Sequence, residues 1–170
     1  VITASATSLS DFDYKVYDTS VVINKYKGSE STVTIPETIS GKPVTHINTE
    51  AFKGNTSVTK VSLPKSLLGI KQSAFEGCTK LSEIIGFENT GVTYIETYAF
   101  RSCTSLKTVN LPKTLKTIAV SVFDGCSALT SVYNLENTQV TTISNSAFQN
   151  CTKLSYVKFP TTLSTLGSSA

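Results

Sequence analysis

An internal repeat restricts what this chain can fold into more than any other feature of the sequence. A phenylalanine preceded by alanine or valine recurs at spacings of 23, 25, 23 and 25 residues: Phe52, Phe75, Phe100, Phe123 and Phe148. Three residues after each phenylalanine lies an asparagine or a cysteine: Asn55, Cys78, Cys103, Cys126 and Cys151. A period of this length predicts a solenoid, because no single unit can bury its own apolar face and neighbouring units must stack.

Each unit contains two apolar segments, and they predict different local structures. The first, as in residues 106–112 (LKTVNLP), alternates inward and outward positions and is typical of a short strand with one buried face. The proline that follows lacks a backbone N–H and ends the strand. The second segment, as in residues 95–100, has apolar residues at i, i+4 and i+5, which predicts one turn of α- or 3₁₀-helix on the opposite wall.

The longer units carry two additional residues at one position. Residues 87–90 (FENT) and 135–138 (LENT) stand where the shorter units have Leu-Pro-Lys followed by Ser or Thr. We expect a bulge there at every second unit, either as a variant turn or as a decorated edge.

The two ends of the chain differ from the repeats. Residues 11–26 lack the Ala-Phe pair and alternate at Phe12, Tyr14 and Val16, which predicts two strands that cover the first unit. We therefore divide the chain into a tail and strand cap, residues 1–30, and a repeat array, residues 31–170. The array stops inside a unit, which predicts a fragment of a longer array. Residues 4–6 (ASA) fit the small-residue end of a signal peptide and support export.

The columns Leu-x-x-Val-x-Leu-Pro, Ile-x-x-x-Ala-Phe and Phe-x-Gly-Cys-Thr-x-Leu together resemble the BspA-like leucine-rich repeat over residues 30–170. The resemblance implies a short, right-handed α/β repeat solenoid. One face would be a sheet of parallel strands, the other would carry short helical or 3₁₀ turns, and a β-hairpin would cap the N-terminal end. It also implies a secreted or cell-surface protein that adheres to host extracellular proteins or to other cells. The family has no catalytic residues to transfer, and its ligand contacts follow no fixed motif.

Composition excludes several functional classes. A net charge of +3 from scattered lysines, with a single arginine, is not the clustered charge of a nucleic-acid-binding surface. No apolar run is long enough for a membrane-spanning helix. The sequence has no paired carboxylates at fixed spacing and no glycine-rich phosphate loop, so we expect no enzyme and no cofactor. The single histidine, His46, shares its place in the unit with Gly69, Tyr94, Thr117, Thr142 and Thr165, which indicates a surface position.

The four cysteines occupy one position in successive units. At a strand spacing of about 5 Å they form a line roughly 15 Å long, and zinc, which binds sulfur at about 2.3 Å, cannot gather them. We therefore expect no metal site. Asn55 occupies the same position in the first unit, which indicates that the position needs a small buried side chain that can hydrogen-bond to the turn backbone. One interpretation is therefore that the cysteines are structural free thiols. Disulfides between neighbouring units also fit the allowed Cα separation.

The outward residues of the predicted strands are the candidate binding surface, which we call the strand face. Its two columns are Lys60, Glu83, Thr108, Ser131 and Tyr156, and Ser62, Ile85, Asn110, Tyr133 and Lys158. Tyrosine offers a wide amphipathic contact at low conformational cost, which favours a protein-binding module. The same tyrosines would suit a glycan, or would merely stabilise the sheet across its strands. A structural spacer that holds another domain off a cell surface is the alternative from a different class, because 26 Thr and 23 Ser give a weakly charged exterior.

Overall fold

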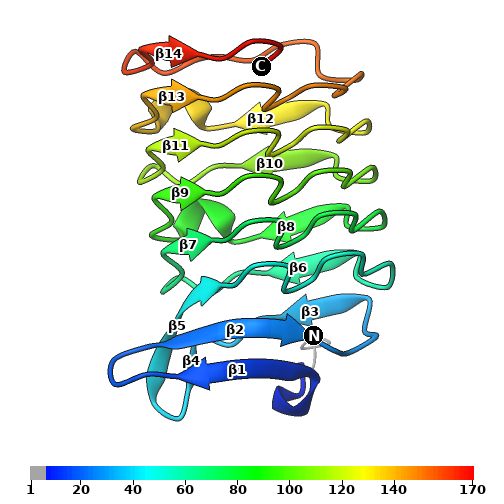
Figure 1. The fold of residues 1–170 in the computed structure, drawn as a ribbon, viewed down its shortest axis with the longest axis vertical. Helices are drawn as coiled ribbons and strands as arrows, with labels where there is room; N and C mark the ends of the chain where they lie inside the picture. The colour runs from blue at the N-terminus through cyan, green and yellow to red at the C-terminus, as the bar shows by residue number, and fades with distance from the viewer. Residues whose placement is uncertain (1–6) are drawn as a thin grey trace, which may run out of the picture.

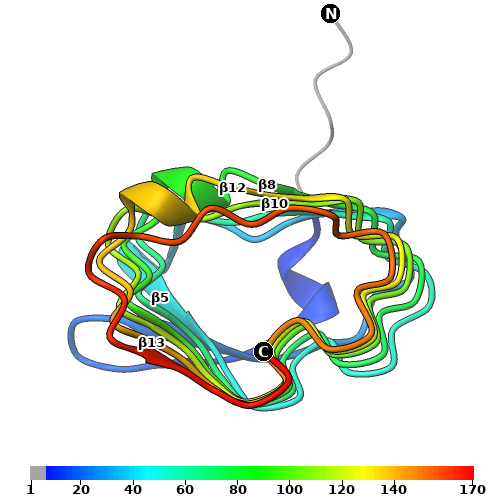
Figure 2. The same ribbon diagram turned by 90° about the horizontal axis from the view of Figure 1, so that it is seen from above.

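A computed structural model describes residues 7–170 as a stack of rungs, each formed by one repeat unit (Figure 1). The chain climbs from the N-terminal strands at one end of the stack to the last rung at the other. Seen along the stack, successive rungs superimpose closely and enclose a shared interior (Figure 2). The fold is a β-solenoid, as the repeat period predicts. Residues 4–6, the candidate end of a signal peptide, lie outside the described residues.

One wall of the stack is a nine-stranded sheet, which we call the long sheet. Along the stack its order is β1, β2, β5, β7, β9, β11, β13 and β14, and β4 pairs with β5 at the side. Neighbours from β2 to β14 are parallel, because each unit returns the chain to the same place one rung further on. The strands are β1 (Phe12–Val16), β2 (Val21–Tyr26), β4 (Thr38–Ile39), β5 (Lys42–Ile47), β7 (Gly69–Ile70), β9 (Tyr94–Ile95), β11 (Thr117–Ile118), β13 (Thr142–Ile143) and β14 (Thr165–Leu166).

The other wall holds the strands that alternation in the sequence predicted. Here β3 (Thr32–Thr34), β6 (Lys60–Ser62) and β8 (Glu83–Ile85) form one parallel sheet, and β10 (Thr108–Asn110) and β12 (Ser131–Tyr133) form another. In β6 and β10 the central valine, Val61 or Val109, is buried and its neighbours are at least partly exposed. The prediction of parallel strands with one buried face is confirmed.

The prediction of helical turns on the opposite wall was wrong. Ile95 ends strand β9, and residues 97–102 form turns that carry the chain round to the other wall. A helix would need its N–H groups to bond within its own segment. Instead, the N–H groups of Tyr98, Phe100 and Ser102 donate along the stack to carbonyls of the next rung, at 3.1, 2.9 and 2.7 Å. Tyr98 and Ser102 also have φ values of 62° and 58°, which break a right-handed helix.

The only helices among residues 7–170 are three 3₁₀ turns: η1 (Leu9–Asp11), η2 (Phe87–Asn89) and η3 (Leu135–Asn137). The turns η2 and η3 are formed by the extra residues of the longer units, and both lie at the same corner of the rung outline (Figure 2). Each follows a residue in the left-handed region, Gly86 at φ 79° and Asn134 at φ 68°. Glycine and asparagine tolerate that conformation best, so the two residues make the bulge possible.

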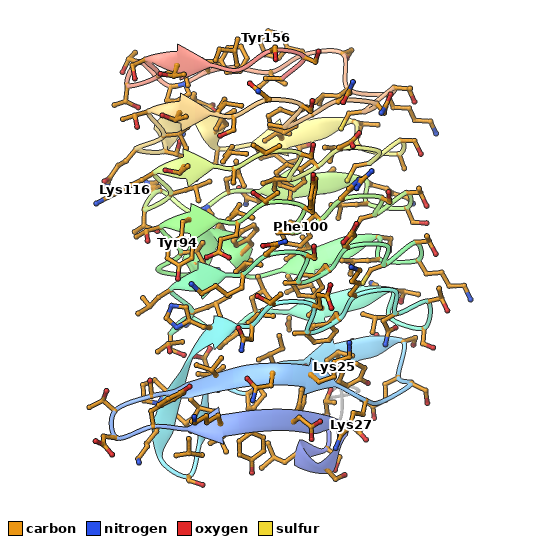
Figure 3. The ribbon with its side chains drawn as sticks, in the orientation of Figure 1. Lys25, Lys27, Tyr94, Phe100, Lys116 and Tyr156 are labelled. Atoms are coloured by element: carbon orange, nitrogen blue, oxygen red, sulfur yellow. The ribbon has the colours of Figure 1, made fainter. Side chains whose placement is uncertain are left out.

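A continuous column of rings runs through the core of the stack, among buried aliphatic side chains. The phenylalanines of successive units stack with centroid separations of 4.7, 5.1, 5.5 and 5.5 Å. Phe100 lies at the centre of this column, between the two walls (Figure 3). Tyr26 of β2 continues the column 5.1 Å from Phe52, and Phe12 of β1 follows 5.2 Å from Tyr26. The antiparallel strands β1 and β2 thus extend the aromatic column beyond the first repeat.

Candidate functional site

The wall opposite the long sheet carries the strand-face residues, which lie there in two adjacent columns. Register pairs Lys60 with Glu83 and Ser62 with Ile85 across β6 and β8. Between β10 and β12 it pairs Thr108 with Ser131 and Asn110 with Tyr133. Strands β8 and β10 belong to separate sheets but contact each other, so the structure places these eight predicted residues along one wall. Tyr156 and Lys158 lie in the rung after β12, in a segment without strand structure.

Charge and apolar area are unevenly distributed along the strand face. On the N-terminal side, Lys60 Nζ contacts Glu83 Oε2 at 2.9 Å, with both side chains about half exposed. Such an ion pair contributes less than about 1 kcal/mol and leaves this region locally neutral. Exposed apolar area increases toward the C-terminal side, where Tyr133 is 55% and Tyr156 73% exposed. Ile85, between the two regions, is 40% exposed.

A hollow of about 320 Å³ lies between β12 and the following rung. The two tyrosines contribute to its lining, and the polar groups around it include an amide, a carboxylate and an ammonium from Asn134, Glu136 and Lys158. The complete lining is Thr130, Ser131, Val132, Tyr133, Asn134, Glu136, Ser155, Tyr156 and Lys158. Flat aromatic surface beside mixed polar groups is what a recognition site for a protein side chain or a sugar requires.

One side of the hollow is lined by the segment in which the last predicted strand of this wall does not form. The strand motif recurs at residues 157–160 (VKFP), with Tyr156 and Lys158 as outward positions, and the prediction of a strand there was wrong. Within the part of the chain that the structure describes, β12 pairs with β10 alone. No backbone hydrogen bond in that part joins residues 155–159 to β12. The segment therefore lacks the ladder that defines a strand, and the space left beside Val132 is the hollow.

The cysteines form a regular series of buried hydrogen bonds. Each Sγ donates to the carbonyl of the phenylalanine one rung earlier, at 3.1 or 3.2 Å; the donors are Cys78, Cys103, Cys126 and Cys151. All four are free thiols. Burial raises the pKa of Cys78 to about 12 and that of Cys151 to about 11, so both are protonated at neutral pH. Asn55 serves the same position by accepting from two turn N–H groups, those of Ser57 and Val58.

His46 lies on the outer side of the long sheet, away from the strand face. It pairs in register with Gly69, which pairs with Tyr94, as the sequence column predicts. The Tyr94 ring covers Gly69, where a Cβ would come within 2.5 Å of that ring. Lys71 Nζ lies 4.8 Å from the Tyr94 centroid and 3.0 Å from Glu96 Oε1. Burial, and then the nearby Lys71 ammonium, lower the pKa of His46, so it is neutral at pH 7.

Sequence reasoning missed a column of alternating charge beside the phenylalanine stack. The residue directly after each of the first four phenylalanines is charged, in the order Lys53, Glu76, Arg101 and Asp124, whereas Gln149 follows the fifth. Neighbours in this column lie 3.3, 3.7 and 3.5 Å apart. This alternation of charge can be read from the sequence, because it requires only that the same position be compared in successive units. If a unit stacked on the unit two places along the chain instead of on its neighbour, residues of like charge would lie side by side. The alternation of charge therefore favours the correct order of the rungs.

No group of three or more histidine, cysteine, aspartate or glutamate side chains within residues 7–170 is arranged to hold a metal ion. In the same range, no helix has the length and apolar character needed to cross a membrane.

The chain belongs to a family of repeat proteins. It matches the model of the BspA type leucine rich repeat region, in six copies, over residues 23–138 and 85–170. The resemblance seen in the sequence is thereby confirmed. No curated protein matches the chain in a sequence search.

Solved structures with the same fold come from bacteria. A leucine-rich repeat protein of T. pallidum is 28% identical with a TM-score of 0.76; the match covers 96% of this chain and 86% of that one. A leucine-rich cell surface protein of Faecalibacterium prausnitzii is 24% identical with a TM-score of 0.73, over 97% of this chain and 51% of that one. The pneumococcal vaccine antigen PcpA is 24% identical with a TM-score of 0.74, over 96% of this chain and 46% of that one. The chain thus spans about half the length of the last two.

Proposed function

We propose that this chain is a non-catalytic, cell-surface or secreted module that binds a protein through its strand face, as in adhesion to host extracellular proteins or to other cells. The observation that carries the proposal is the pair of exposed tyrosines, Tyr133 and Tyr156, beside the hollow. Two exposed rings that line one hollow provide the aromatic anchors on which protein interfaces depend. The description of one structural relative as a cell surface protein supports the location.

A glycan is the second candidate ligand, favoured by the composition of the hollow. The Glu136 carboxylate can accept from sugar hydroxyls, the Lys158 ammonium can donate to them and the Asn134 amide can do either, while a tyrosine ring packs against the apolar face of the sugar. A protein and a glycan would use the same tyrosines, so one pair of variants tests both.

Replacing both tyrosines by alanine, Tyr133→Ala with Tyr156→Ala, should weaken binding at least about 30-fold, because loss of an aromatic anchor costs about 2 kcal/mol or more. The two side chains are more than half exposed, so the fold and its thermal unfolding should be unchanged. Binding is measured by surface plasmon resonance against immobilised extracellular-matrix and plasma proteins, and on a glycan array.

The matched control is Tyr17→Ala, which removes an exposed tyrosine from the connection between β1 and β2 and should leave affinity unchanged. A folded double variant that binds as well as the parent protein would eliminate the hollow as the site. If the parent protein showed no saturable binding, the result would favour the alternative function, a structural spacer. A spacer needs a rigid stack but no ligand site.

A further inference from the structure

Among the described residues, strand β1 is one of the two edge strands of the long sheet, and β14 is the other. Strand β1 pairs with β2 on one side and with no other strand in the described chain; it is the last strand at this end of the stack, where the η1 turn and the β4–β5 loop reach further out (Figure 1). Only Phe12 of this strand is buried, whereas Tyr14 and Val16 are 37% and 40% exposed. An unpaired edge with exposed aromatic and aliphatic side chains is a template for a further strand.

The alternation of hydrogen bonds shows which backbone groups face that edge. The Asp11 carbonyl accepts from Lys27 N–H at 2.7 Å, and Tyr17 N–H donates to the Ser20 carbonyl at 2.8 Å. Odd-numbered residues of this segment therefore point their backbone groups at β2, and even-numbered ones point away. Tyr14 offers both its N–H and its C=O to the free edge. Val16 offers its N–H and Phe12 its C=O, while Phe12 N–H already bonds to the Leu9 carbonyl.

These groups are self-complementary in an antiparallel register centred on Tyr14. Tyr14 would exchange two hydrogen bonds with its equivalent in a second copy, and each Val16 N–H would donate to the opposite Phe12 carbonyl. In the same register each Asp13 lies opposite Lys15 of the other copy. Opposite charges at directly facing positions stabilise an antiparallel pair, and like charges there destabilise it.

We propose that β1 is a self-association edge, through which two copies of this chain join their long sheets in an antiparallel, two-fold symmetric pair. The exposed Tyr14 and Val16 side chains are covered in the pair, Val16 packing beside Phe12 of the second copy. The Asp13 carboxylate, which contacts Lys27 Nζ at 2.7 Å, then lies between two ammonium groups. The strand face is at the other wall of the solenoid and stays open in both copies.

The test uses complementary charge reversals measured by sedimentation velocity on the full chain. The unaltered chain should form a reversible dimer with a dissociation constant on the order of 0.1 mM, since an edge-to-edge contact is small. Asp13→Lys alone places two lysines opposite each other, and Lys15→Asp alone places two aspartates opposite each other, so each variant should be monomeric. An equimolar mixture restores both attractive pairs and should recover the dimer.

Matched controls make the same charge changes away from β1: Glu88→Lys for the first variant and Lys116→Asp for the second. Lys116 lies several rungs further along the stack (Figure 3), and both control variants should dimerise like the parent. Circular dichroism and thermal melting check that the single variants remain folded. A parent chain that is monomeric at ten times the expected dissociation constant would overturn the proposal, as would a mixture of folded single variants that stays monomeric.

Discussion

Replacing Phe100 by alanine should lower the free energy of unfolding by about 4 kcal/mol, as measured by urea denaturation followed by circular dichroism. Phe100 is fully buried and its ring stacks on Phe75 and Phe123, with centroids 5.1 and 5.5 Å away. Its removal therefore loses the transfer free energy of the ring, leaves a cavity in the middle of the stack and separates two halves of the aromatic column. No neighbouring rung can close that gap, because the main-chain ladders fix the spacing of the rungs on both sides.

The matched control for this variant is Phe159→Ala, the same chemical change in a ring that is 43% exposed. We expect it to cost about 1 kcal/mol, since only part of that side chain leaves water on folding and no closed cavity is left behind. If the two variants were equally stable, the aromatic column would not be the source of the cohesion between rungs.

Stability should fall steeply above pH 9, and the buried cysteines should account for much of the fall. The ordinary thiol pKa is 9.0, whereas burial raises the pKa of Cys78 to about 12 and that of Cys151 to about 11. Burial also raises the pKa of Cys103 and Cys126. Above pH 9 the unfolded chain releases these protons and the folded chain keeps them, so the unfolded state binds fewer protons and is favoured as pH rises.

Each thiol should remove about 1.4 kcal/mol of stability per pH unit between pH 9 and its folded pKa, and nothing below pH 8. Urea denaturation under reducing conditions from pH 8 to pH 10.5 measures the slope. Cys103→Ala should make the slope shallower by about 1.4 kcal/mol per unit. Leu106→Ala, a buried residue of the same rung without a thiol, should lower stability at every pH and keep the slope. An unchanged slope in Cys103→Ala would show that its thiol ionises equally in the folded and unfolded states.

Spacing in the sequence identifies the interior of this protein well, because every unit offers its side chains the same environment. A buried phenylalanine in one unit predicts a buried phenylalanine one rung later, and the alternation around Val61 and Val109 identifies the strands of one wall. The other wall was predicted wrongly because apolar residues at i, i+4 and i+5 fit a helical turn and also a strand followed by a turn. What decides between them is the direction of the N–H groups, and the neighbouring rung determines that.

The candidate site could be predicted only in part, for a related reason. Alternation along the strands predicts that Tyr133 points outward, and the register then places it beside Asn110. The hollow depends on residues 155–159 lying beside β12 without hydrogen bonds to it, and nothing in the repeat signals that departure. The edge formed by β1 is a consequence of chain order in the long sheet, which repeat spacing does not specify.

The direction of the hydrogen bonds between rungs determines how this protein would respond to mechanical force. These bonds run along the stack, so a pull between β1 and the last rung loads the rung contacts in series and the weakest one yields first. Each rung that peels away releases 23–25 residues. A fully extended segment of that length spans about 80–90 Å, against about 5 Å for the rung in the stack. Pulled in this direction, such a chain would lengthen in discrete steps while the remaining rungs stay intact, so tension would be dissipated one rung at a time.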